Sequence, residues 1–172
     1  MKRLISLATT VCLASPAVGQ IEVQFQDGNP WDTFAITNTG CVIIQAKLDI
    51  DLSTSLAGVL IDTEYGGPGT KDPMPAELAR GKATLSPVTD GDQHIHLAIR
   101  KLDSGTPIQV RLDVDDTAGS RYAPKVEVYG DEITGATVTL DYAGQKTRGT
   151  FNAAGRATVA LPENTPDCAL VS

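Results

Sequence analysis

The stretch Ile108-Gln109-Val110-Arg111-Leu112-Asp113-Val114-Asp115 alternates apolar and polar side chains from its first residue to its last. Because successive side chains of a β-strand point to opposite faces of the sheet, this alternation indicates a strand with one buried face. The same period occurs around Ile95-His96-Leu97, Leu48-Asp49-Ile50 and Ile21-Glu22-Val23. Further short strands are predicted at residues 34–38, 58–63, 125–129, 136–142, 147–151 and 156–161.

Turns rich in Gly, Asp and Asn separate these segments, and no convincing amphipathic helix lies between them. About ten short strands at this spacing predict an antiparallel β-sandwich, immunoglobulin-like or jelly-roll in style. A closed barrel is the structural alternative. The one plausible helical turn is at residues 75–80, inside a Gly- and Pro-rich stretch that is more typical of a long irregular loop.

The first 19 residues have the build of a secretory signal peptide. Met1-Lys2-Arg3 is a basic start, residues 4–14 are apolar, and Ala17-Val18-Gly19 is a site of small residues. We predict cleavage after Gly19, a mature chain that begins at Gln20, and a secreted or periplasmic location. We expect no transmembrane segment in the mature chain, and we expect residues 20–172 to form a single domain.

Loss of the predicted signal leaves 12 Lys and Arg against 21 Asp and Glu, a formal charge of −9. Such a field makes nucleic acid a poor partner, whereas divalent cations and basic molecules remain compatible with it. Cys12 would leave with the signal, so Cys41 and Cys168 would be the only thiols in an oxidising compartment. We therefore predict a Cys41–Cys168 disulfide.

Three carboxylates within four residues form the densest acidic cluster, Asp113, Asp115 and Asp116. Asp113 and Asp115 share one strand face, and Asp116 starts the following loop, so their oxygens could converge on a hard cation. An EF-hand loop is excluded, because it needs an Asp or Asn where Thr117 stands and a glycine where Ala118 stands. We predict calcium binding at these three aspartates, against the alternative that they cap turns and hydrate a strand edge. Other acidic groups could join them: Asp90 and Asp92, Asp49 and Asp51, and Asp131 with Glu132.

His94 and His96 form a His-x-His pair on the polar face of a predicted strand. This spacing lets two imidazoles meet one zinc or copper ion, with a third ligand from an Asp, a Glu or Met74. We expect the two histidines to be surface residues that need no metal for folding. No Gly-x-Ser-x-Gly motif is present, and we expect a protein that is not an enzyme.

Several segments together resemble the bacterial aggregation factor core proteins, a family of small exported proteins. Phe34-Ala35-Ile36-Thr37-Asn38-Thr39-Gly40-Cys41 carries the likeness first, and it extends through residues 49–63, 90–92, 112–117 and 132–136. The family is named after the core subunit of sponge aggregation factors, extracellular assemblies that join cells in a calcium-dependent way. The resemblance implies a non-enzymatic adhesion or matrix role.

The signal peptide, the acidic charge and the resemblance together predict an extracellular or periplasmic interaction module. Its expected partner is an extracellular protein, a polysaccharide or a second copy of the chain. The competing hypothesis is a periplasmic zinc- or copper-binding protein or enzyme that uses His94 and His96.

Overall fold

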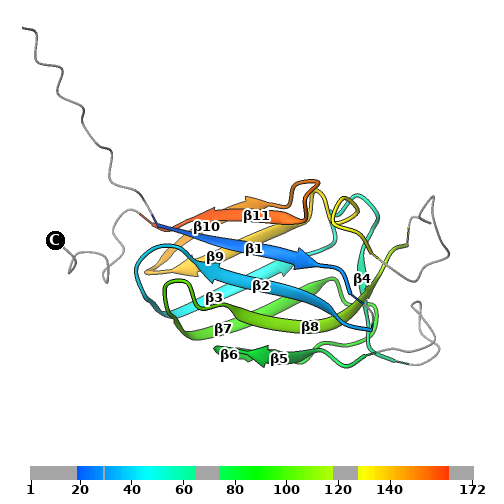
Figure 1. The fold of residues 1–172 in the computed structure, drawn as a ribbon, viewed down its shortest axis with the longest axis horizontal. Coiled ribbons are helices and arrows are strands. Elements are labelled where there is room, and N and C mark those ends of the chain that lie inside the picture. Colours follow the sequence, from blue (N-terminus) through cyan, green and yellow to red (C-terminus); the bar gives the residue numbers. More distant parts are fainter. Residues whose placement is uncertain (1–18, 29, 65–73, 118–127, 163–172) are drawn as a thin grey trace, which may run out of the picture.

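The computed structural model describes residues 19–28, 30–64, 74–117 and 128–162 of the chain. In these ranges all the elements are β-strands, with no helix among them. The strands form two antiparallel sheets packed face to face (Figure 1). The predicted β-sandwich is confirmed, and the two sheets are separate hydrogen-bonded ladders rather than one closed barrel.

The first sheet has the order β11-β1-β2-β8-β4, and β5 also pairs with β8. Its strands are β1 (Gln20–Gln26), β2 (Asp32–Asn38), β4 (Leu60–Asp62), β5 (Glu77–Arg80), β8 (Ile108–Asp115) and β11 (Arg156–Ala160). The second sheet has the order β10-β9-β3-β7-β6. Its strands are β3 (Ile43–Asp51), β6 (Lys82–Leu85), β7 (His94–Leu102), β9 (Thr137–Tyr142) and β10 (Gln145–Thr150).

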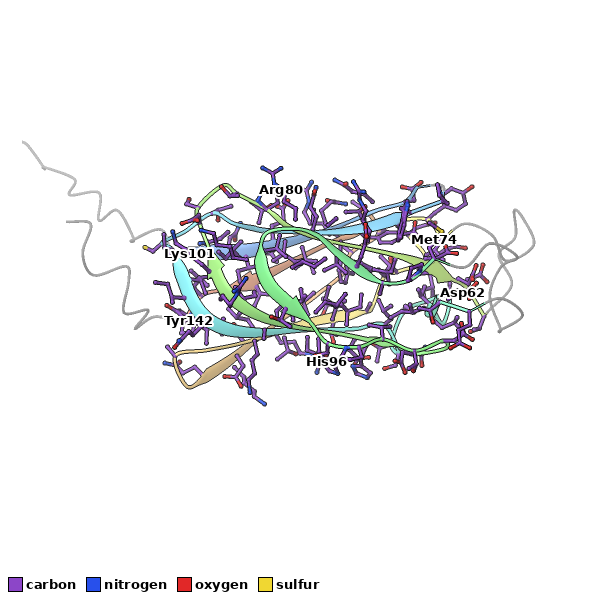
Figure 2. All side chains as sticks on the ribbon, turned by 90° about the horizontal axis from the view of Figure 1, so that it is seen from below. Asp62, Met74, Arg80, His96, Lys101 and Tyr142 are labelled. Carbon is purple, nitrogen blue, oxygen red and sulfur yellow. The ribbon has the colours of Figure 1, made fainter. Side chains whose placement is uncertain are left out.

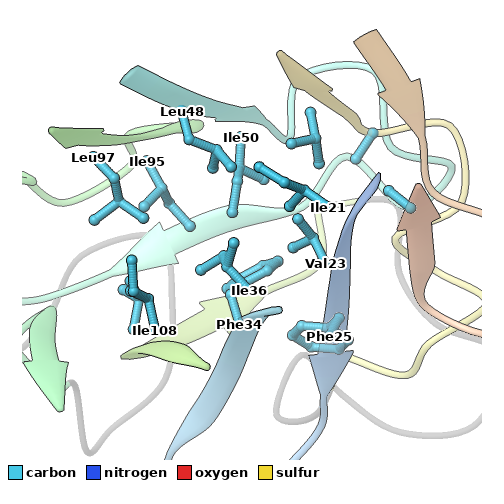
Figure 3. Packing of buried hydrophobic residues seen from close by; sticks show 14 of the residues in the cluster. Ile21, Val23, Phe25, Phe34, Ile36, Leu48, Ile50, Ile95, Leu97 and Ile108 are labelled. Atoms are coloured by element: carbon cyan, nitrogen blue, oxygen red, sulfur yellow. The ribbon is translucent and has the colours of Figure 1, made fainter. Parts of the chain in front are cut away.

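The core lies between the sheets and is built from the alternate apolar residues that the sequence identifies. In β7, for example, Ile95, Leu97 and Ile99 are buried while the residues between them are exposed. Figure 3 shows Ile95 and Leu97 together with residues of the facing sheet such as Ile36 and Ile108. Each buried side chain of this size contributes about 1.5–3 kcal/mol by leaving water, which is why the alternating pattern is enough to specify the sandwich.

Two parts of the strand prediction need correction. Residues 75–80 contain no helical turn, because Glu77–Arg80 is the strand β5, and β6 (Lys82–Leu85) follows it without having been predicted. The predicted strand at 125–129 falls partly outside the described residues, and its last two residues, Val128 and Tyr129, are not in a strand.

The predicted signal segment lies outside the described residues except for Gly19, so its cleavage stays a prediction. The first strand, β1, begins at Gln20, the residue predicted to open the mature chain. Nothing in the described ranges is a helix of the length and apolarity that crossing a membrane requires.

The predicted disulfide joins a described residue to one outside the described ranges. Cys41 lies two residues before β3, where its carbonyl accepts a hydrogen bond from the side-chain amide of the buried Asn38. Cys168 lies outside the described residues. Replacing either cysteine by Ser is expected to lower the free energy of unfolding by about 2–5 kcal/mol, because the bridge closes a loop of more than about 100 residues.

Urea unfolding of the secreted protein measures this loss, and the double variant is the control. If Cys41 and Cys168 form one bridge, the double variant loses no more stability than either single variant, since the bridge is lost only once. Additive losses, or free thiols on the native protein, would show that the two cysteines are not bonded to each other.

Candidate metal centres

A cluster of buried carboxylates lies where the short strand β4 pairs with the end of β8. Asp62 is paired with Asp113, and Leu60 is paired with Asp115. Because residues two apart on a strand share a face, the side chains of Asp62, Asp113 and Asp115 lie on the same side of this ladder. The pairing thus brings one carboxylate from β4 to two carboxylates of β8.

The three carboxylates are close together and shielded from water. One oxygen from each lies within 4.8 Å of the others. Their exposed fractions are 0% for Asp62, 9% for Asp113 and 1% for Asp115. If all three carboxylates were ionised at this separation, each pair would repel by about 3 kcal/mol at an effective dielectric constant near 20, a repulsion that a bound cation, a proton or a basic group relieves.

Two of the three predicted calcium ligands, Asp113 and Asp115, belong to this group. The third, Asp116, is also buried at 2% exposure, but its carboxylate is not part of the group that converges. The third carboxylate of the group is that of Asp62, a residue that the sequence pattern does not mark as a ligand. We name Asp62, Asp113 and Asp115 the acidic centre.

Asp32 is a further buried carboxylate, on β2 next to this part of β8. It accepts hydrogen bonds from the backbone amides of Gly28 and Val114, each at 3.1 Å. Burial raises the pKa of Asp32 to about 7, with a smaller contribution from the charge of Asp113 and against the opposing effect of the two amide donors.

Three of the other acidic residues considered from the sequence, Asp90, Asp92 and Glu132, accept hydrogen bonds that hold nearby turns. Asp90 accepts a hydrogen bond from the backbone amide of Thr63 at 3.0 Å, which holds the residue that follows β4. Asp92 accepts from the amide and hydroxyl of Thr89, and these bonds lower its pKa. Glu132 accepts from the amide of Tyr129 at 2.8 Å.

The histidine pair lies elsewhere, on the outward face of the second sheet. Figure 2 shows His96 on this face and Asp62 at one end of the sandwich, so the two candidate centres are separate. The side chains of His94 and His96 are 47% and 60% exposed, which confirms the prediction that they are surface residues. The pairing of β3 with β7 places Asp49 opposite His96 and Asp51 opposite His94.

Asp49 is in position to give a third ligand atom, which the spacing of the two histidines alone does not identify. An oxygen of Asp49 and one nitrogen from each imidazole lie within 4.8 Å of one another. The sequence marks Asp49 as a polar-face residue of a strand, but the register between β3 and β7 is needed to place it beside the histidines. Asp62 has a similar signal, since it is the one charged residue of β4 (Leu60–Asp62).

These positions rest on the geometry of this chain alone. The resemblance to the aggregation factor core proteins accordingly stays a prediction from the quoted segments. Comparisons with protein families, curated protein sequences and solved structures find no match for this chain.

Proposed function

We propose that the protein is an exported, non-enzymatic interaction module whose contacts depend on calcium bound at the acidic centre. The observation that carries this proposal is the convergence of Asp62, Asp113 and Asp115 at almost complete burial. Carboxylate oxygens are the ligands that calcium prefers, and calcium tolerates the irregular geometry that side chains from two strands provide.

The charge of the chain supports a role for a divalent cation. The predicted mature chain carries a formal charge of −9, with three of its negative charges concentrated in the acidic centre. A bound calcium ion offsets two of these three charges and lowers the repulsion that a second acidic molecule meets at this end of the sandwich. Calcium-dependent self-association, or binding to an extracellular protein or polysaccharide, follows from the same electrostatic argument.

The position of the acidic centre suits a contact site. Asp62 lies at one end of the sandwich rather than in the middle of a sheet (Figure 2). Sites at the ends of sandwiches lie next to the loops, where binding surfaces are most often built on a rigid scaffold.

Thermal unfolding of residues 20–172 with and without calcium tests the site. Extracellular calcium modules bind at about 10⁻⁴–10⁻³ M. At about 10 mM calcium this affinity raises the free energy of unfolding by about 1.4–2.7 kcal/mol, or Tm by about 3–10 °C. Magnesium at the same concentration is expected to give a smaller shift, because it demands a stricter octahedral geometry.

Three variants identify the ligands. Asp62→Asn is expected to abolish the calcium shift, since it removes the carboxylate that β4 contributes. Asp116→Asn is expected to retain it, and Asp131→Asn, an exposed site with the same change of charge, serves as the matched control. An unchanged Tm of the wild type in calcium, or a full shift in Asp62→Asn, would contradict the assignment and mean that the charge of the acidic centre is balanced within the chain.

A further inference from the structure

The middle of the outward face of the second sheet carries a square of four ligand-forming side chains. Asp49 and Asp51 alternate on β3, His94 and His96 alternate on β7, and the strands pair Asp49 with His96 and Asp51 with His94. All four side chains therefore leave the sheet on one side. Because they stand on paired strands and not on a loop, their backbone positions are fixed by the ladder.

Both imidazoles are turned toward one oxygen of Asp49. The Oδ1 atom of Asp49 lies 2.7 Å from Nδ1 of His96 and 3.5 Å from Nδ1 of His94. The two rings stack with their centroids 5.6 Å apart and their planes 11° from parallel. Although Asp49 Oδ1 is enclosed, it has no well-aligned hydrogen-bond donor among the described residues. One nitrogen from each imidazole and one oxygen of Asp49 thus lie close enough together to bind one ion.

Asp51 supports this arrangement from the side. Its Oδ1 atom lies 3.7 Å from Nε2 of His94, the ring nitrogen that faces away from Asp49. Ser53 holds Asp51 in place by donating its backbone amide and its hydroxyl to the same carboxylate. A carboxylate facing the second nitrogen of a ligating histidine fixes its ring and its tautomer.

We infer that Asp49, His94 and His96 form an exchangeable site for a divalent transition metal of the zinc or copper class. The ligand atoms are Nδ1 of each histidine and Oδ1 of Asp49, and Asp51 positions His94. Tetrahedral zinc with bonds near 2.0–2.1 Å separates its ligand atoms by about 3.3 Å, which small side-chain rotations reach from the observed 2.7 and 3.5 Å.

Ligand type separates this site from the acidic centre. Imidazole suits zinc and copper, whereas the all-carboxylate acidic centre suits calcium. Three protein ligands leave one position of a tetrahedral metal open, as in sites that bind a further molecule. Asp49 and His96 also line an open groove of about 560 Å³, together with Lys47, Lys146 and Asp141, which leaves room for a further small ligand on the metal.

Titration of untagged residues 20–172 with zinc alone and with copper alone, in millimolar calcium, tests the site by calorimetry. We expect one equivalent of either metal per chain, with copper bound more tightly than zinc. Asp49→Asn is expected to weaken binding at least about tenfold, and Asp51→Asn to weaken it about 10- to 100-fold through the orientation of His94. The electron paramagnetic resonance spectrum of the copper form should show two nitrogen ligands in the wild type.

Replacement of both histidines by Gln is the decisive variant. It should abolish binding of zinc and copper, leave the metal-free unfolding transition unchanged because both side chains are exposed, and leave the calcium shift intact. Asp62→Asn is the matched control and should bind zinc like the wild type, so that failure of the calcium site and failure of this site give different results. Stoichiometric zinc binding retained in the double Gln variant, or no binding by the wild type, would overturn the inference.

Discussion

Replacing Phe34 by Ala is expected to lower the free energy of unfolding by about 3–5 kcal/mol, one of the largest losses at any single site in the described structure. Phe34 is fully buried on β2. Its ring centroid lies 5.2 Å from that of Phe25 and 6.2 Å from that of Phe151, the latter in an edge-to-face contact. Truncation therefore removes both aromatic contacts and leaves a cavity that the surrounding strands cannot fill.

Urea unfolding measures the loss, and Leu56→Ala is the matched control. Leu56 is a large apolar residue, but it is 74% exposed, so its truncation should change stability by no more than about 0.5 kcal/mol. Equal effects of the two substitutions would contradict the packing described for the core.

The second large effect is a pH dependence caused by Asp32. Its pKa is about 7 in the folded protein and 3.8 as an ordinary side chain, so between these values the folded state holds a proton that the unfolded state has released. The contribution of protonated Asp32 to the free energy of unfolding is fully present below about pH 4 and is lost as the pH rises through about 7. Three pKa units correspond to about 4 kcal/mol.

The stability difference between wild type and Asp32→Asn isolates this effect from the other carboxylates. Measured by urea unfolding in a calcium chelator, the variant should gain about 4 kcal/mol relative to the wild type between pH 4 and pH 8. In Asp32→Asn a hydrogen bond from the amide of Gly28 or Val114 is lost, which lowers the free energy of unfolding by an amount that does not depend on pH. A difference that does not vary with pH would show that Asp32 is ionised throughout this range.

Most of the strands that the sequence predicts bury one face and leave the other more exposed. The burial of β1 alternates from end to end and that of β7 alternates from His94 to Arg100, so their periodicity is visible. β5 could not be found this way, because only Leu78 of its four residues is even partly buried. The left-handed backbone conformation of Gln45, where φ is 58°, is equally hidden, since no glycine marks the positive φ.

Only two of the three ligand residues of each candidate centre can be recognised from the sequence. Asp113 and Asp115 are neighbours in sequence, and so are His94 and His96, so each pair could be recognised from spacing. Their partners come from other strands, and the register between strands depends on hydrogen bonds and packing that spacing does not encode. Asp62 reaches the first pair through β4, and Asp49 reaches the second through β3.

The central claim is that calcium binds the acidic centre and promotes assembly, and native mass spectrometry of residues 20–172 tests both parts together. We expect one calcium ion per wild-type chain at millimolar calcium, together with multimers that disappear when the ion is chelated. Asp62→Asn should bind no specific calcium and remain monomeric under the same conditions. Equal calcium occupancy in wild type and Asp62→Asn, or no bound calcium in either, would contradict it.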